Sequence, residues 1–342
     1  MRSLDEVGAG PRATAVAAPA LRIAALGGGT GLPRVLAGLA PGLEPGLEPD
    51  EERRVDVTAI VTTADDGGSS GELRRAYGVP APGDVRNCLV ALAPGPNPLA
   101  GVFQHRFEGG GGLHGHTVGN VVLTALAQRL GDFGSAVAAA AELLGVRGRV
   151  LPASAEPVEL LARLEDGRLV RGEAALARAR GRVAELRLAR PADAPAAAID
   201  AVLSADLVVF GPGSLYSSVL ASLLARGMPE ALRATSATRV LVVNLFTQPG
   251  ETDGYAASDH VRALRRHLGD VVDVALVHRS PLPAAIVRAY ADEGAAPVPI
   301  DRAALEALGV VPVVLDLLAP GDVGRHDPQK LARALLAIAQ AR

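Results

Sequence analysis

Apolar runs alternate with amphipathic stretches along most of the chain, from Leu21 onward. In four segments an apolar strand leads into a polar or glycine-rich loop and then a helix, and these segments begin at Leu21, Val55, Ala205 and Thr238. Further helices are predicted over 115–130, 133–145 and 327–341. Strands that alternate with helices are typical of a parallel sheet covered by helices. We therefore predict a three-layer α/β/α, Rossmann-like fold.

The pattern changes between Val150 and Leu188, where polar-alternating runs flank the pair Asp166–Gly167. An Asp-Gly pair between two such runs predicts a β-hairpin. We therefore expect a small antiparallel insertion over about 150–190, inside a single domain that spans 21–342.

Two segments lack a periodic pattern. Residues 1–20 are rich in Ala, Gly and Pro and lack the basic start and apolar core of a signal peptide, so we predict a disordered tail. The Pro/Glu-rich segment 41–54 is predicted to be a solvated surface connection.

The composition limits the classes of partner. Of the 342 residues 49% are hydrophobic, which indicates a globular protein, and no apolar run reaches the roughly 18 residues that span a bilayer. The net charge of −3, without a basic block, and an aromatic content of 3% disfavour nucleic acid or a membrane surface as partner. Cys88 is the only cysteine, which excludes an internal disulfide. We interpret it as a buried apolar residue and expect a cytoplasmic location.

The four strand–loop–helix segments place similar loops after their strands: "GGGTG", "ADDGGSSG", "GPGSLYSS" and "TQPGETDGY". The carboxyl ends of parallel strands lie at one edge of a sheet, where free amide groups and helix N-termini favour an anion. We therefore predict a phosphate-bearing ligand at this edge. The candidate ligand-binding residues in these loops are Gly28, Gly29, Thr30, Gly31, Asp65, Asp66, Gly68, Ser69, Ser70, Gly211, Gly213, Ser214, Tyr216 and Thr247.

Two common phosphate-binding motifs do not match. A P-loop ends in Gly-Lys-Ser/Thr, but the only lysine is Lys330, near the C-terminus, so Walker-type nucleotide hydrolysis is excluded. The dinucleotide fingerprint G-x-G-x-x-G would place Leu32 where its third glycine belongs. A dinucleotide-dependent oxidoreductase is therefore disfavoured, although the loop 27–31 could still hold a pyrophosphate.

The adjacent carboxylates Asp65 and Asp66 have three interpretations. They could bind Mg²⁺ bridged to ligand phosphates, because Mg²⁺ prefers oxygen ligands. They could bind a ribose hydroxyl or other uncharged ligand groups, or they could cap the following helix. Since two bare carboxylates would repel a phosphate, a cation or hydrogen-bonded hydroxyl groups should lie between them.

The segment "APGDVRNCL" predicts a helix with Asp84 as its N-cap, followed by Arg86 and Asn87 as candidate ligand contacts. A guanidinium can bind two phosphate oxygens at once, so Arg86 is either a phosphate clamp or a surface arginine.

The segment "LHGHTVGN" places His114 and His116 two residues apart. On a strand this spacing could direct both imidazoles to a zinc ion, but no third Cys, Asp or Glu ligand is near in sequence, which disfavours zinc. We predict that His116 and Asn120 hydrogen-bond a ligand or the loop.

Taken together, these segments resemble the gluconeogenesis-factor family (YvcK type), which is related to the 2-phospho-L-lactate transferases of deazaflavin cofactor synthesis (CofD type). The matching stretches are "GGGTGLPRVLAGL", "TAIVTTADDGGSSGELR", "APGDVRN", "HGHTVGN", "ADLVVFGPGSLYSSV", "NLFTQPGETDGY" and "GRHDPQKLA". They follow the family order from about residue 22 to 335. The "ADDGGSSG" form is more similar to the gluconeogenesis-factor branch.

The resemblance implies a Rossmann-like fold, a cytoplasmic location and a homodimer. In the transferase branch the acidic strand end, matched here by Asp65 and Asp66, works with Mg²⁺ to join a guanylylated phospholactate to a deazaflavin. The gluconeogenesis-factor branch is associated with cell shape on gluconeogenic carbon sources and with UDP-sugar binding. A tyrosine and an arginine implicated there match Tyr290 and Arg325.

The residues themselves allow other roles at both positions. Tyr290 could stack on a base or be a half-buried helix residue. Arg325 could grip a diphosphate, and Asp327 could cap the last helix.

Two functions follow for the chain. The favoured one is a non-catalytic nucleotide-sugar sensor that regulates cell shape, and the alternative is a Mg²⁺-dependent transferase of the 2-phospho-L-lactate type.

Overall fold

The computed structural model describes residues 20–40, 55–279, 281–321 and 324–341. Within these residues the apolar runs form a seven-stranded sheet in the order β10-β9-β8-β7-β1-β2-β3, and every neighbouring pair is parallel. The strands are β1 (Leu21–Gly27), β2 (Val55–Val61), β3 (Arg149–Pro152), β7 (Leu207–Phe210), β8 (Thr238–Val242), β9 (Val274–His278) and β10 (Val311–Leu315). The predicted tail and the loop 41–54 lie outside the described residues, apart from Ala20 at the end of the tail.

The order of the strands creates a switch point between β1 and β7. The chain runs from β1 through β2 to β3 at one edge, returns to the centre as β7, and then continues through β8 and β9 to β10 at the other edge. Ligands of open α/β sheets bind at the carboxyl ends of strands that flank such a point. The four loops predicted to bind phosphate follow β8, β7, β1 and β2, which are consecutive in the sheet.

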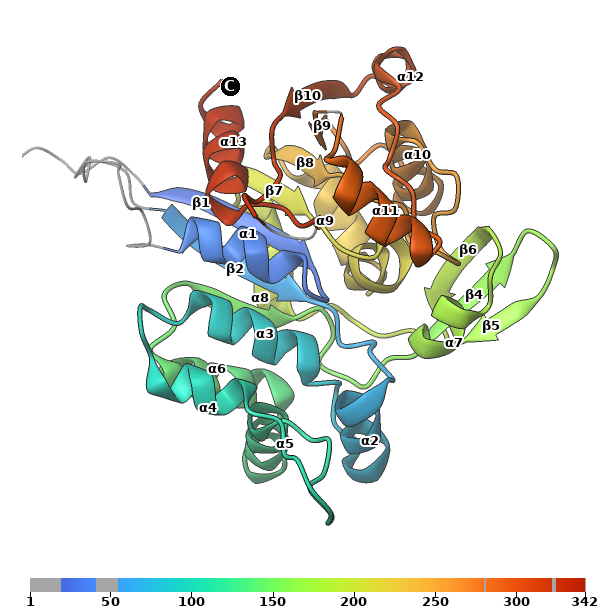
Figure 1. Cartoon of the computed structure of the whole chain (residues 1–342). Coiled ribbons are helices and arrows are strands. Elements are labelled where there is room, and N and C mark those ends of the chain that lie inside the picture. The colour runs from blue at the N-terminus through green and yellow to red at the C-terminus, as the bar shows by residue number, and fades with distance from the viewer. Residues whose placement is uncertain (1–19, 41–54, 280, 322–323, 342) are drawn as a thin grey trace, which may run out of the picture.

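Helices cover both faces of the sheet, so the predicted three layers are confirmed (Figure 1). Along β1, Ile23 and Ala25 belong to one buried core while Ala24 and Leu26 belong to the other, because successive side chains alternate between faces. The first core contains α1 (Leu32–Leu39), α3 (Gly83–Leu92), α5 (Val118–Leu130), α6 (Phe133–Leu144) and α13 (Pro328–Gln340). The second contains α8 (Ala196–Leu203), α9 (Met228–Ala234), α10 (Ala257–Leu268) and α12 (Arg302–Ala307).

The predicted insertion is a separate three-stranded antiparallel sheet in the order β5-β4-β6. Its elements are β4 (Leu160–Leu164), β5 (Leu169–Arg171), α7 (Glu173–Arg178) and β6 (Val183–Leu188). The hairpin at Asp166–Gly167 is confirmed, and Gly167 adopts the positive φ of +87° that the turn requires. The predicted range begins too early, because β3 pairs in parallel with β2 and belongs to the main sheet.

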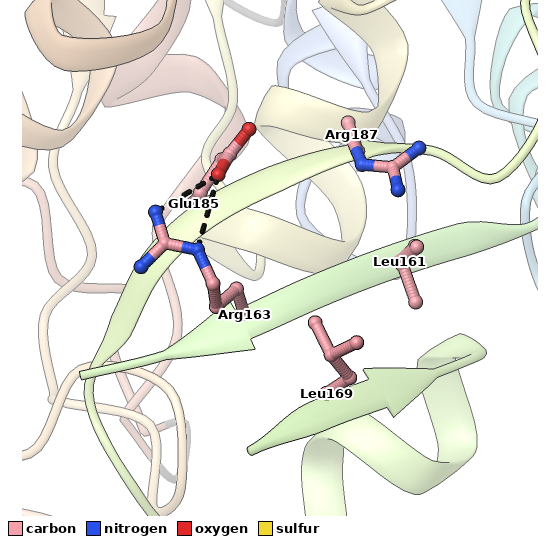
Figure 2. Close-up of a pocket in the computed structure, with 5 residues that line it drawn as sticks. All are labelled: Leu161, Arg163, Leu169, Glu185 and Arg187. Atoms are coloured by element: carbon pink, nitrogen blue, oxygen red, sulfur yellow. Dashed lines mark hydrogen bonds and ion pairs between the residues drawn. The ribbon is translucent and has the colours of Figure 1, made fainter. Parts of the chain in front are cut away.

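The solvent face of this small sheet has a shallow hollow of about 140 Å³. Figure 2 shows the Arg163 guanidinium bonded to the Glu185 carboxylate, at 2.9 Å, beside Leu161 and Leu169. None of the predicted ligand-binding residues lines this hollow.

The segment after β7 differs from the regular helix that the sequence predicts. It forms a π-helical turn, η1 (Leu215–Val219), followed by a 3₁₀ turn, η2 (Leu220–Leu223). The amide of Val219 donates to the Ser214 carbonyl five residues earlier, at 2.9 Å, which widens the turn. Within the described part of the chain, no helix is both long and apolar enough to cross a bilayer.

Candidate functional site at the carboxyl edge of the sheet

The loops after β1 and β7 meet at the switch point. Gly31 packs so closely on Pro212 that a Cβ at position 31 would overlap the Pro212 carbonyl oxygen. The loop after β7 is joined in turn to the end of β8, because the Gly213 amide donates to Asn244 Oδ1 at 3.0 Å and Asn244 Nδ2 donates to the Gly213 carbonyl at 2.7 Å. Three of the four predicted loops therefore form one continuous edge.

The other loop residues differ in their access to a ligand. Thr30 and Gly68 are exposed, Gly29, Gly213 and Ser214 are half-buried, and Gly28, Ser70 and Gly211 are buried.

Asp84 does not cap α3, so that prediction is wrong. The helix begins at Gly83 with Pro82 as N-cap, which places Asp84 inside the first turn. From there its Oδ2 accepts a hydrogen bond from the Gly29 amide at 2.7 Å. Burial raises the pKa of Asp84 to about 6, although the Gly29 bond opposes the shift. A carboxyl of the protein thus lies against the glycine loop predicted to receive a phosphate.

Asp65 and Asp66 point to different partners. Asp65 Oδ1 accepts from the Gly67 amide at 2.8 Å, in the turn that leads into α2 (Gly68–Tyr77). Asp66 Oδ1 accepts from the Ala174 amide at 2.8 Å, in the first turn of α7. Asp66 therefore caps a helix of the insertion and not the following helix α2, which has no side-chain cap.

This divergence does not favour a shared metal site. The described residues contain no group of three or more His, Cys, Asp or Glu side chains that could hold a metal ion. The charge of Asp65 instead acts on Asp84, whose pKa it helps to raise. One oxygen of Asp65 and one of Asp66 are thus turned to different backbone amides, and the two carboxylates are not preformed as a pair.

Two further carboxyl groups lie at this edge and were not predicted from the sequence, Glu173 and Glu251. Glu173 on α7 is half-buried, and its pKa is raised to about 9 by burial and then by the charges of Asp65, Asp84 and Glu251. A carboxyl with this pKa is protonated at neutral pH, so it can donate a hydrogen bond to a ligand oxygen.

Glu251 is fully buried beside the π-helical turn. It accepts from the Ser217 hydroxyl at 3.0 Å and from the Tyr216 amide at 3.3 Å, and burial raises its pKa. Its position within "TQPGETDGY" was a signal that could have identified it. Glu173 lies in the insertion and has no such signal.

Arg86 is a buried residue and not a surface arginine, which excludes that alternative. Its Nη1 donates to Thr117 Oγ1 and to Asn120 Oδ1, the latter at 3.0 Å, and its Nη2 donates to Asn87 Oδ1 at 2.7 Å. Burial and then the nearby Arg106 lower the pKa of Arg86. Its Nε is buried without a hydrogen-bond partner within the described part of the chain. The guanidinium thus holds the predicted residues Asn87 and Asn120 in place.

The structure brings Ser69, His116 and Asn120 together. His116 Nδ1 lies 3.0 Å from Ser69 Oγ, and Asn120 Nδ2 donates to the same oxygen at 3.1 Å. The other ring nitrogen of His116 lies 3.3 Å from Glu72, so both nitrogens contact protein groups. His114 is exposed.

Tyr216 and Thr247 are held inside the protein. The Tyr216 side chain is fully buried, and its hydroxyl lies 2.8 Å from that of Tyr255. Burial raises the pKa of Tyr216 well above the usual range. Thr247 Oγ1 accepts from the Ala296 amide at 2.9 Å, which fixes the loop after β8. Neither side chain is presented at the surface.

Tyr290 and the segment that carries Arg325 are in contact. The Tyr290 ring, on α11 (Ala284–Asp292), stacks on Phe246 with ring centroids 4.0 Å apart and planes 10° apart. Its hydroxyl donates to the carbonyl of Gly324, the residue before Arg325, at 3.3 Å. Arg325 is exposed. Phe246 directly precedes the loop after β8, so this pair adjoins the same edge. The predicted N-cap Asp327 is confirmed by its bond to the Lys330 amide at 2.9 Å.

Known proteins are similar to this chain over nearly its whole length. A gluconeogenesis factor from Halalkalibacterium halodurans is 43% identical, over 92% of this chain and 95% of that protein. A gluconeogenesis factor from Bacillus subtilis is 42% identical, over 92% of this chain and 97% of that protein. A crystal structure of a Bacillus halodurans protein, 41% identical, superposes with a TM-score of 0.87 and covers 93% of this chain and 99% of that one.

The sequence model described as 2-phospho-L-lactate transferase CofD matches residues 23–318. This match covers the four loops at the carboxyl edge and Tyr290, and it ends before Arg325. The main sequence prediction fits the relatives better than the alternative, since the relatives bear the name gluconeogenesis factor and the transferase is a family relationship. The chain therefore belongs to the CofD family.

Proposed function

We propose that the protein is a nucleotide-sugar-binding regulator, and that a UDP-sugar binds at the carboxyl edge of the sheet. The observation that carries this proposal is the position of Tyr290, stacked on Phe246 and bonded to Gly324 beside the exposed Arg325. An arginine can bind two oxygens of a diphosphate at once. The relatives named gluconeogenesis factor support the regulatory role.

The carboxyl groups at the edge are consistent with a sugar ligand. Asp65 keeps one oxygen beyond its bond to Gly67, and a carboxylate oxygen can accept from a sugar hydroxyl. Glu173, protonated at neutral pH, can donate to an oxygen of the ligand. This combination of acceptors and donors suits hydroxyl groups better than a bare phosphate.

Isothermal titration with UDP-N-acetylglucosamine, with and without Mg²⁺, tests the proposal. We expect binding without Mg²⁺, weakened at least about tenfold by Arg325→Ala, which corresponds to about 1.4 kcal/mol. The control is Arg302→Ala, which removes an exposed arginine from α12 and should leave the affinity unchanged. Equal affinities of Arg325→Ala and the unmodified protein would contradict the assigned site.

The transferase alternative makes a different prediction in the same titration. Preference for GDP that disappears without Mg²⁺ would favour it, because the transferase branch relies on that metal. The proposal further includes a cytoplasmic homodimer that supports cell shape during growth on gluconeogenic carbon sources. Light scattering of the purified protein tests the dimer, and a monomer mass would remove that part.

A further inference from the structure

A continuous chain of polar contacts runs from the buried core to the surface beside α2. Arg86 Nη1 donates to Asn120 Oδ1 at 3.0 Å, and Asn120 Nδ2 donates to Ser69 Oγ at 3.1 Å. Ser69 Oγ lies 3.0 Å from His116 Nδ1, and His116 Nε2 lies 3.3 Å from Glu72 Oε2. These polar contacts thus join a serine, a histidine and a carboxylate, one after another.

The guanidinium of Arg86 fixes the orientation of the Asn120 amide, and the tautomer of His116 sets the direction of its bond to Ser69. A guanidinium only donates, so Asn120 must turn its Oδ1 to Arg86 and its Nδ2 to Ser69. At the other end a carboxylate accepts, so a neutral His116 that presents Nε2–H to Glu72 leaves Nδ1 as an acceptor. In this tautomer the Ser69 hydroxyl donates its proton to Nδ1.

Ser69 also lies where a developing negative charge is stabilised. It is in the first turn of α2, and the first bond within that helix runs from the Gly71 amide to the Gly67 carbonyl, at 2.9 Å. The amides of residues 68–70 therefore have no partner within the helix, and the positive end of the helix dipole points toward them. Ser69 keeps 8% of its surface exposed.

A cavity of about 320 Å³ lies between α2 and α5, next to this series of polar contacts. The polar part of its lining consists of Glu72, His116, Thr124 and Gln128, and Ser69 lies behind His116 and does not itself line the cavity. The apolar part of its lining consists of Leu73, Ala76, Tyr77, Leu113, Val121 and Ala125. Ligand sites are commonly of this size, mostly apolar with a few polar groups. The cavity has room for a small apolar acyl or alcohol group next to the histidine.

We propose that Ser69 is a nucleophilic serine that cleaves carboxylic esters of small apolar groups, with His116 as its general base and Glu72 as the residue that positions His116. Ser69 Oγ bonds to the ester carbonyl carbon while its proton passes to His116 Nδ1. The carbon–oxygen bond to the alcohol then breaks, and the alcohol leaves with that proton. Water, deprotonated by Nδ1, hydrolyses the acyl-serine and restores the hydroxyl. This activity does not depend on the proposed nucleotide-sugar binding.

The test uses p-nitrophenyl butyrate as substrate and a fluorophosphonate as covalent probe, which loses fluoride when the serine oxygen attacks its phosphorus. We expect steady p-nitrophenol release and a phosphonyl adduct on the Ser69 peptide by mass spectrometry. Ser69→Ala should abolish the adduct and reduce the turnover by about 100-fold or more. The control is Ser204→Ala, which removes an exposed serine from the end of α8 and should change neither.

The positioning role of Glu72 is tested by a measurement that a purely structural role would leave unchanged. Glu72→Gln should lower kcat several-fold with little change in KM and alter its pH profile, and Glu72→Asp should recover part of the loss. Circular dichroism of each variant establishes that it is folded. The proposal is overturned if the unmodified protein gives neither adduct nor turnover, if the adduct lies on another residue, or if folded Ser69→Ala is as active as the unmodified protein.

Discussion

The Asp84 carboxylate accepts a hydrogen bond from the amide of Gly29, which lies 55 positions earlier in the sequence. The bond joins the first turn of α3 to the loop after β1, so part of the capacity of this loop to bind anions is used by the protein itself. A diphosphate at this edge therefore meets a carboxyl that competes for the same amide. Ligand binding and the charge of Asp84 should consequently be coupled.

The raised pKa of Asp84 predicts how stability depends on pH. Between its usual value of 3.8 and the value of about 6 in the folded protein, the folded state binds more protons than the unfolded chain. The contribution of Asp84 to stability therefore falls as pH rises through this window. Asp84→Asn lacks this loss because an amide does not ionise, while its oxygen can still accept from Gly29. Urea unfolding at pH 4 and pH 7 should show the variant gaining on the order of 1–3 kcal/mol relative to the unmodified protein. A stability difference between Asp84→Asn and the unmodified protein that is the same at both pH values would contradict the raised pKa.

The raised pKa of Glu173 predicts a second, wider pH range in which stability falls as pH rises. Its pKa rises from 4.5 to about 9, so its contribution to stability also falls as pH rises, and the fall continues through neutral pH. Between pH 7 and pH 9, where Asp84 is already ionised, Glu173→Gln should lose less thermal stability than the unmodified protein. The matched control is Glu165→Gln, at an exposed carboxylate of the same insertion. Parallel melting curves for the unmodified protein and Glu173→Gln would exclude the assigned pKa.

Gly31 tests the contact between the two central loops. Its φ of −80° suits any residue, so the need for glycine comes from the backbone of Pro212 and Gly213, above all the Pro212 carbonyl oxygen. Gly31→Ala should destabilise the protein by about 2–4 kcal/mol, because the backbone of the loop after β7 must move. Gly101→Ala, in α4 (Pro98–Gln104), is the control, since its Cβ would meet no atom within 4 Å. Thermal unfolding of both variants checks the prediction, and equal melting temperatures would show that the loops can separate freely.

The fold was predictable because its signals are local. The alternation of strands and helices, the Asp166–Gly167 turn and the cap at Asp327 are each read from a few neighbouring residues. The π-helical turn after β7 was not predicted, because it is fixed by contacts with Glu251, more than thirty positions away. Local patterns carry no information about such distant bonds.

The site was predictable in its location but not in its pairings. Asp65 and Asp66 are adjacent in sequence, yet Asp65 bonds to the turn before α2 and Asp66 to the first turn of α7. Nothing in the local pattern pairs Asp65 with Asp84, and Glu173 lies near both only because the insertion packs against this edge. Which carboxyl groups meet depends on how the insertion docks, and no periodicity specifies that.

The position of β1 has a consequence for the synthesis of the protein on the ribosome. The Arg22 amide at the start of β1 donates to Asp206 at 2.9 Å, across 184 positions. When β1, β2 and β3 have emerged, the other edge of β1 still lacks β7, and unpaired apolar strand edges promote aggregation. β1 is synthesised first, but its pairing with β7 can form only after Phe210 has left the exit tunnel. A nascent chain paused before that point should therefore be a substrate for a ribosome-associated chaperone.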